Sequence, residues 1–133
     1  EILTCDWSSD VCSSDLLSGE AIEYVASLLG FSPAHIEGVA TFYTMYRRKP
    51  VGKYHLQICR NLSCSLMGAE HLIEHVARKI GARPGETTAD GRFTLSTAEC
   101  LGSCGTAPVM QVNDDYYENL TEESIDALLD GLR

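Results

Sequence analysis

The 133-residue sequence contains no run of the roughly 18 to 20 consecutive apolar residues that a helix needs to cross a bilayer. We therefore expect a soluble chain with no membrane-inserted segment. Basic residues are also scarce, since 10 Lys and Arg stand against 19 Asp and Glu and give a formal net charge of −9. Because phosphate binding needs clustered Lys and Arg, a nucleic-acid partner is not expected.

The first sixteen residues do not resemble folded protein. The stretch from Ser8 to Asp15 has no hydrophobic period, and residues 6–16 match the translation of a common sequencing-library adapter. We interpret residues 1–16 as a sequencing-adapter artefact joined to a truncated gene, and we exclude them from fold reasoning. Cys5 and Cys12 are therefore not considered as candidate functional cysteines. Four acidic residues are excluded as well, so 15 acidic residues remain against 10 basic ones and the net charge becomes −5.

Residues 17–49 are expected to form an N-terminal helical hairpin. Ser18 precedes a stretch whose apolar residues recur every three or four positions up to Gly30, a common helix stop. Ser32 and Pro33 then form a strong helix-start pair for a second helix that runs to Phe42. A basic stretch follows at residues 47–53, which is either a solvated connector or a docking patch for an acidic partner surface.

Residues 50–133 are expected to form an α/β domain in the order strand, helix, strand, strand, helix, with one further strand that is hard to place from the sequence. The predicted strands cover residues 54–59, 92–97 and 108–112, and a further short strand holds Tyr116 and Tyr117 after an Asn-Asp-Asp turn. The predicted helices cover residues 67–80, ending at Gly81, and a final segment capped by Thr121. A four-stranded mixed sheet flanked by helices, which is a thioredoxin-like arrangement, is the simplest way to close this order.

The four remaining cysteines form two pairs, each placed just past the end of a predicted strand. Cys59 and Cys64 bracket four residues, and Cys100 and Cys104 bracket three. Two such loops side by side would present four thiolates, the usual ligand set of a [2Fe–2S] cluster. We expect Gly68, Gly102 and Gly105 to let the backbone turn or approach closely near the sulfurs.

The spacing of these cysteines favours a binuclear cluster but leaves other chemistry open. Structural zinc sites usually use Cys-x2-Cys, and a thioredoxin-type dithiol needs the same spacing, which this sequence lacks. A disulfide framework is not expected in a cytosolic chain. Zinc and disulfides therefore remain as alternatives behind the iron–sulfur interpretation.

One further motif resembles a metal site. His71, Glu74 and His75 match the His-x-x-Glu-His pattern of inverted zinc proteases. We expect solvent-facing histidines and an ion-pairing Glu74 instead, because no downstream acidic helix offers an obvious third ligand.

With these residues in view, the sequence resembles the thioredoxin-like [2Fe–2S] (24 kDa) subunit family of respiratory NADH:quinone oxidoreductase, or complex I. The resemblance covers residues 17–133, and most of the N-terminal helices of that family are missing. The matching stretches are Gly38-Val-Ala-Thr-Phe-Tyr43, Cys59-Arg-Asn-Leu-Ser-Cys64, Pro84 to Leu95, Glu99-Cys-Leu-Gly-Ser-Cys104, Pro108-Val-Met and the last helix.

The resemblance implies an electron-transfer subunit without a catalytic site of its own. It implies one [2Fe–2S] cluster on Cys59, Cys64, Cys100 and Cys104, exchanging electrons with FMN in a flavoprotein partner that also binds NADH. The location it implies is cytoplasmic, peripheral to the inner membrane. The same module recurs in NAD-linked hydrogenases and formate dehydrogenases, which are the first alternative; a zinc-stabilised interaction domain is a more distant one.

Overall fold

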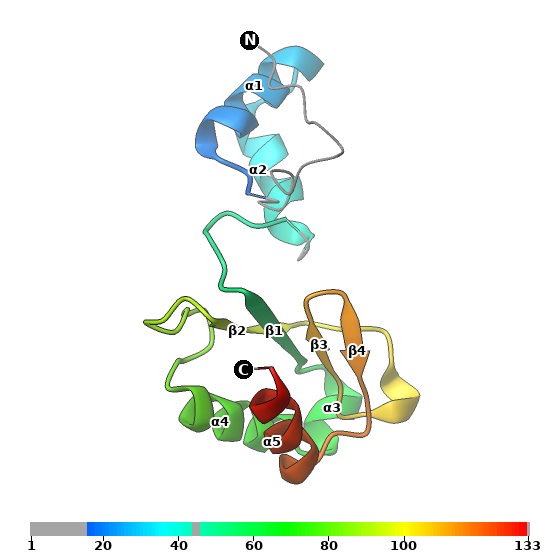
Figure 1. Cartoon of the computed structure of the whole chain (residues 1–133). Coiled ribbons are helices and arrows are strands. Elements are labelled where there is room, and N and C mark those ends of the chain that lie inside the picture. The colour runs from blue at the N-terminus through cyan, green and yellow to red at the C-terminus, as the bar shows by residue number, and fades with distance from the viewer. Residues whose placement is uncertain (1–15, 44–45, 133) are drawn as a thin grey trace. The chain divides into compact units, whose positions relative to one another are not determined.

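The computed structural model describes residues 16–43 and 46–132. The chain divides into two compact units, residues 1–50 and 51–133, and each is considered by itself (Figure 1). Residues 1–15, nearly all of the segment interpreted as an artefact, lie outside the described residues. Leu16, its last residue, pairs with Arg47 in an isolated parallel bridge.

The first unit contains the two predicted helices, α1 (Gly19–Leu29) and α2 (Pro33–Phe42). The Ser18 hydroxyl accepts a hydrogen bond from the backbone N–H of Ala21, and Gly30 ends α1 with a φ of +69°. The Ser32 hydroxyl caps α2 in the same way, accepting from the N–H of His35 at 3.3 Å. Both predicted helix starts are therefore confirmed, and both depend on local capping chemistry.

This helical unit leaves much of its apolar surface open. Leu28 and Leu29, which the periodicity assigns to the apolar face of α1, are 69% and 57% exposed. An apolar cavity of about 390 Å³ lies between the helices, with Ile22 and Ile36 among its lining residues. Two short helices alone do not bury their apolar faces, which is the expected behaviour of so small a unit.

The second unit is built on the predicted four-stranded mixed sheet. Its strands are β1 (Tyr54–Cys59), β2 (Phe93–Ala98), β3 (Met110–Val112) and β4 (Asp115–Tyr117), in the spatial order β2-β1-β3-β4. Strand β1 runs parallel to β2 and antiparallel to β3, which pairs antiparallel with β4. The prediction for β1 is confirmed at both ends. Strand β3 begins at Met110 instead of Pro108, after a cis peptide bond between Ala107 and Pro108.

The helices of this unit differ from the prediction at one place. A short helix α3 (Leu62–Leu66) precedes α4 (Ala69–Ile80), so the predicted helix start at Met67 is wrong. Gly68 separates the two helices with a φ of +90°, a conformation that favours glycine. A single 3₁₀ turn, η2 (Cys104–Thr106), and the C-terminal helix α5 (Glu122–Gly131) complete the unit. Helices α4 and α5 pack on the same face of the sheet (Figure 1).

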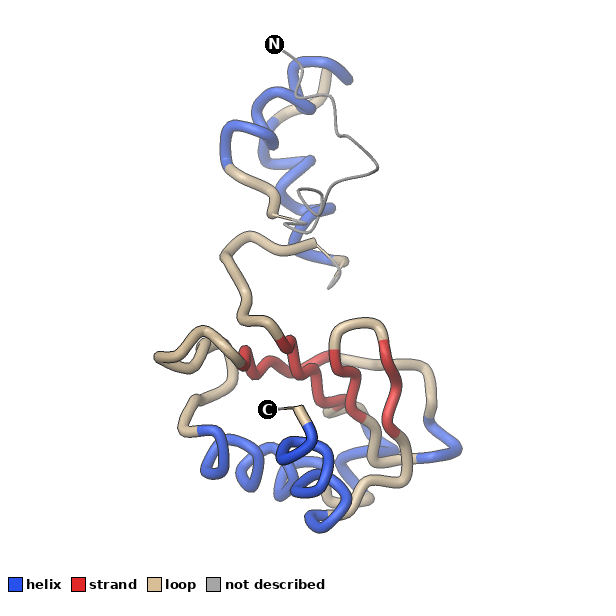
Figure 2. The backbone as a smooth tube through the Cα atoms, viewed as in Figure 1, coloured by secondary structure: helices blue, strands red, loops and turns tan. Residues whose placement is uncertain are grey.

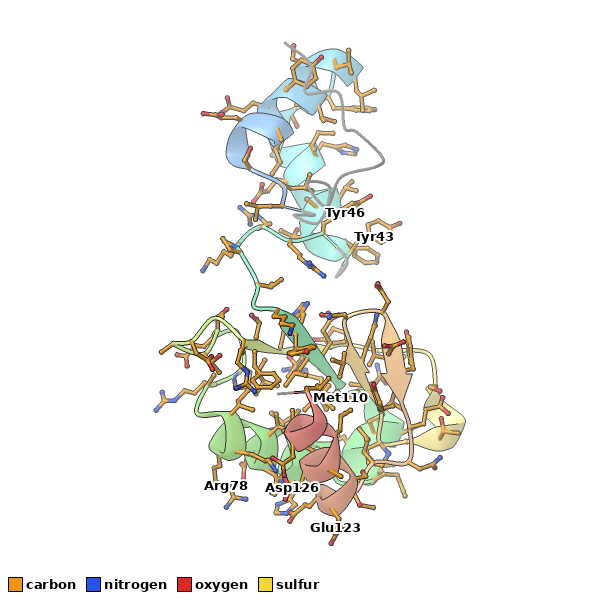
Figure 3. All side chains as sticks on the ribbon, viewed as in Figure 1. Tyr43, Tyr46, Arg78, Met110, Glu123 and Asp126 are labelled. Carbon is orange, nitrogen blue, oxygen red and sulfur yellow. The ribbon has the colours of Figure 1, made fainter. Side chains whose placement is uncertain are left out.

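The core of the second unit lies between the sheet and helices α4 and α5. Leu56, Ile58, Leu95, Met110 and Ile125 are fully buried there, and Figure 3 shows Met110 between the strands and α5. This core fixes the sheet whose strand ends carry the cysteine loops. None of the helices in the described ranges is long and apolar enough to span a bilayer.

Candidate metal centre

The two cysteine loops leave the sheet at the same edge. Strands β1 and β2 are parallel neighbours, and the last residue of β1, Cys59, lies in register with the last residue of β2, Ala98. The backbone N–H of Arg60 donates to the carbonyl of Ala98 at 3.0 Å, which keeps the strands together as they end. Because the carboxyl ends of parallel strands share one edge, the loops after them start side by side (Figure 2).

The four predicted ligand residues differ in burial. Cys59 and Cys64 are buried against Ala69 and Val109, whereas Cys100 and Cys104 are exposed; all four are free thiols. Helix α3, which carries Cys64, contacts the η2 turn that begins at Cys104. The buried pair is thus held by packing, and the exposed pair by its loop.

The Cys59 thiol lies at the centre of the group. Burial raises its pKa, but hydrogen bonds from backbone groups of Asn61 and Leu101 and from the thiols of Cys64 and Cys100 outweigh burial and lower it. Leu101 and Cys100 belong to the second cysteine loop, so both loops contact this one sulfur. The same contacts favour a thiolate, the form that binds metals.

The pKa of the Cys64 thiol is shifted in the opposite direction, upward. Burial, its hydrogen bond to Cys59 and the charges of Cys59 and Cys104 raise its pKa, while a backbone hydrogen bond from Val109 lowers it. The influence of Cys104 on Cys64 is a second interaction between the two loops. Several thiolates gathered in one place repel one another unless positive charge lies among them, which a metal supplies.

Backbone groups favour negative charge at this place as well. The N–H of Gly102 donates to the Cys100 sulfur at 3.4 Å. Gly102 has a φ of +78°, so this turn favours glycine. At Gly68, Gly102 and Gly105 an added Cβ would meet no atom of the chain within 4 Å, so the backbone there is open to an approaching group. Four thiols on two loops, with backbone N–H groups directed at the sulfurs, are a donor set that fits an anionic iron–sulfur group.

Two polar contacts around the loops escaped the sequence analysis. Arg60, in the first loop, pairs with Glu99, which precedes the second loop. The hydroxyl of Ser103, in the second loop, donates to the carboxylate of Glu118. Neither pair could be found from spacing, because each joins side chains brought together only by the fold.

The histidine motif on α4 faces an acidic helix, contrary to expectation. His71 pairs with Glu122, and the Nε2 atom of His75 lies 2.8 Å from Asp126 on α5. The side chain of His75 is only 17% exposed, so the prediction of a solvent-facing residue is wrong there. Among residues 16–43 and 46–132, no three His, Cys, Asp or Glu side chains, the four cysteines included, are arranged to hold a single metal ion. A [2Fe–2S] cluster does not require such a group, because its four thiolates are shared between two irons.

Comparison with known proteins identifies the family to which this architecture belongs. The family model of the thioredoxin-like [2Fe–2S] ferredoxins matches residues 12–133, nearly the whole chain. The chain belongs to the thioredoxin-like [2Fe–2S] ferredoxin family. Membership confirms the predicted family and fold class, and agrees with the mixed sheet of the second unit.

Curated relatives of this ferredoxin are named as subunits of NADH-quinone oxidoreductases. The chain is 51% identical over 117 residues to such a subunit from Rhizobium meliloti (strain 1021), covering 88% of this chain and 70% of the relative. It is 52% identical over 115 residues to subunit 2 of the Thermus thermophilus enzyme, covering 86% of this chain and 64% of the relative. The chain therefore spans about two thirds of the length of these relatives.

A more distant similarity concerns the fold alone. The crystal structure of an NAD+-reducing [NiFe]-hydrogenase in the H2-reduced state matches with a TM-score of 0.71 and 23% identity. The match covers 92% of this ferredoxin and 21% of the hydrogenase chain. The air-oxidised state of that enzyme gives a TM-score of 0.67 at 24% identity, over 85% of this chain and 20% of the other.

Proposed function

We propose that this chain is the electron-transfer subunit of an NADH:quinone oxidoreductase and binds one [2Fe–2S] cluster through Cys59, Cys64, Cys100 and Cys104. The observation that carries the proposal is the interaction of Cys59 with thiols of both loops at the shared edge of β1 and β2. The identity of about 50% to NADH-quinone oxidoreductase subunits supports the choice of complex.

Each loop has a defined part in holding the group. Cys59 and Cys64 would supply two thiolates from a buried position, and Cys100 and Cys104 would supply two from an exposed one. When bound, a [2Fe–2S] cluster supplies one-electron transfer. The N–H of Gly102 and the backbone groups near Cys59 stabilise the negative charge of the sulfurs. The exposed side of the site gives a redox partner access.

The proposed partner is a flavoprotein subunit that carries FMN and binds NADH, and the chain would reach the inner membrane only through the other subunits. Leu62, Leu66 and Met67, which we call the α3 patch, are 70%, 77% and 62% exposed. The α3 patch adjoins Cys64 and lies on or just after the helix that contacts the Cys104 turn. Exposed apolar side chains around an exposed redox site are a suitable surface for such a partner.

Metal analysis tests the cluster. The full chain, purified without oxygen, should contain two irons and two sulfides, show visible absorption that bleaches with dithionite, and give an electron paramagnetic resonance signal when reduced. A colourless chain with one zinc per molecule would contradict the proposal and favour a zinc-stabilised interaction domain.

A binding measurement tests the partner. Leu66→Glu should weaken binding of the flavoprotein subunit by at least about tenfold, because a charge would be buried against an apolar surface. Its visible spectrum should match that of the wild type. Tyr116→Glu is the matched control, since Tyr116 is 50% exposed on β4, outside the α3 patch. Equal binding by both variants would exclude the α3 patch.

Neighbouring genes separate the respiratory complex from the alternative complexes. Genes for membrane subunits favour the respiratory enzyme, whereas hydrogenase or molybdenum-enzyme genes favour a soluble one.

A further inference from the structure

The second cysteine loop has little apolar packing to hold it, since within the loop only the half-buried Leu101 packs against the buried cluster around Cys59 and Cys64. Cys100 and Cys104 are exposed, and no residue of the η2 turn (Cys104–Thr106) is buried. The first loop differs, because Cys59 and Cys64 pack with Ala69 and Val109. An exposed loop that must keep two sulfurs in place needs polar contacts with a fixed part of the fold.

Those contacts come from the segment between β4 and α5. The hydroxyl of Ser103 donates to the Glu118 carboxylate and lies 2.9 Å from the hydroxyl of Thr106. Hydrogen bonds from Ser103, and then from Thr106, hold the pKa of Glu118 below its usual range. The carboxylate therefore accepts directly from Ser103, while the Thr106 hydroxyl donates to the carbonyl of Ser103 at 3.2 Å and lies beside the Ser103 hydroxyl.

The segment that carries Glu118 is itself fixed to the core. The backbone N–H of Asn119 donates to the carbonyl of Thr106 at 2.8 Å, and that of Leu120 donates to the carbonyl of Pro108 at 3.1 Å. The Leu120 side chain is buried in the main core, and α5 begins two residues later. Glu118 thus lies one residue from the backbone contacts and two from a core side chain, and its carboxylate connects the loop to them.

We propose that Glu118 is a positioning residue for the candidate cluster, which holds the Cys100–Cys104 loop in its ligating conformation through the hydroxyls of Ser103 and Thr106. The inference rests on the proposed function for the identity of the ligand. The arrangement of the loop by Glu118 is a property of the chain itself. Hydrogen bonds to a charged group are stronger than neutral ones, so loss of the carboxylate should loosen the conformation of the whole turn.

The first test compares cluster retention in Glu118→Ala, Glu118→Gln and the wild-type chain. In excess iron chelator without oxygen, Glu118→Ala should lose its visible absorption roughly three- to tenfold faster than the wild type, the effect of one lost charge-assisted hydrogen bond. Glu118→Gln keeps an acceptor oxygen but not the charge, and should recover about half of this loss. Glu74→Ala, which removes an exposed carboxylate from α4, should match the wild type.

A double-mutant cycle tests the pairing with Ser103. Ser103→Ala should speed cluster loss, and the Ser103→Ala, Glu118→Ala double variant should be no faster than Glu118→Ala alone, because both remove one interaction. Additive effects would overturn the pairing. Wild-type loss rates in Glu118→Ala would overturn the proposal as a whole.

A second measurement needs no metal. In the iron-free full chain, amide hydrogen exchange over residues 101–108 should be faster in Glu118→Ala than in the wild type and unchanged in Glu74→Ala. Equal exchange in all three would contradict a positioning role. A wild-type chain that takes up no iron would contradict the proposed function, while the exchange experiment would still decide the role of Glu118.

Discussion

The Nε atom of Arg60 lies 3.3 Å from a carboxylate oxygen of Glu99, so an ion pair joins the two cysteine loops. Arg60 directly follows Cys59, and Glu99 directly precedes Cys100. Both side chains are largely exposed, at 52% and 82%. Solvent therefore screens the pair, and its contribution to folding stability is small. Its position beside two proposed ligands gives it another role, in setting the local charge.

We expect the two members of this pair to shift the reduction potential in opposite directions. Glu99→Gln removes a negative charge near the site and should raise the potential, whereas Arg60→Gln removes a positive charge and should lower it. The shifts should be on the order of tens of millivolts, since both groups are solvent-exposed. A titration followed by electron paramagnetic resonance measures them. Shifts of the same sign in both variants would exclude an electrostatic cause.

Replacement of single cysteines tests the proposed ligand set. Cys59→Ser and Cys104→Ser should each lose the cluster or hold it weakly, because each removes one of four thiolates. Cys5→Ser and Cys12→Ser should have no effect on iron and sulfide content. These two cysteines lie outside the described residues and within the segment interpreted as an artefact. Equal damage from all four substitutions would refute that interpretation.

Local sequence signals predicted most of the fold. Ser18 and Ser32 start their helices by capping chemistry that involves only nearby residues, and β1 begins and ends where its alternation does. Helix α3 was missed because it is only five residues long and its Leu62 and Leu66 face solvent, which leaves no apolar period to detect.

Contacts between distant segments could not be predicted in this way. The sequence indicates that His75 belongs to a helix face, but only the fold brings Asp126 to within 2.8 Å of it. The same holds for Glu118, which is 15 residues from Ser103 along the chain. The cysteine pairs were predictable because each is local; their mutual contact depends on the parallel pairing of β1 with β2.

Truncation in the core should cost much more stability than truncation on the α3 patch. Leu56 is fully buried between the sheet and helices, so Leu56→Ala should lower the free energy of unfolding by about 2–5 kcal/mol. Leu66 is 77% exposed, and Leu66→Ala should change that free energy by no more than about 0.5 kcal/mol. Urea unfolding followed by circular dichroism measures both. Similar losses would mean that α3 packs against the chain.

Helices α4 and α5 are joined by a ladder of ion pairs. Asp126 on α5 contacts His75 at 2.8 Å and Lys79 at 3.1 Å, and Lys79 also reaches Asp130 at 3.4 Å. Figure 3 shows Asp126 on α5, on the side toward the lower edge of the view. The hydrogen bond from His75, and then that from Lys79, holds the pKa of Asp126 below its usual 3.8. Burial lowers the pKa of Lys79, but hydrogen bonds to Asp126 and Asp130 outweigh it and raise the value above 10.5.

These shifts define the pH range in which the ladder stabilises the fold. A lowered carboxyl pKa contributes folding stability above pH 3.8, and this stability is lost as the pH falls through the lower pKa of the folded state. A raised lysine pKa contributes folding stability below pH 10.5, and this stability is lost as the pH rises through the higher pKa of the folded state. Asp126→Asn should therefore be less stable than the wild type near pH 6, and the difference should vanish in strong acid. Urea unfolding from pH 2 to 7 measures this, with Asp114→Asn, an exposed turn residue, as the control. A difference that persists at pH 2 would show that Asp126 acts by packing and not by charge.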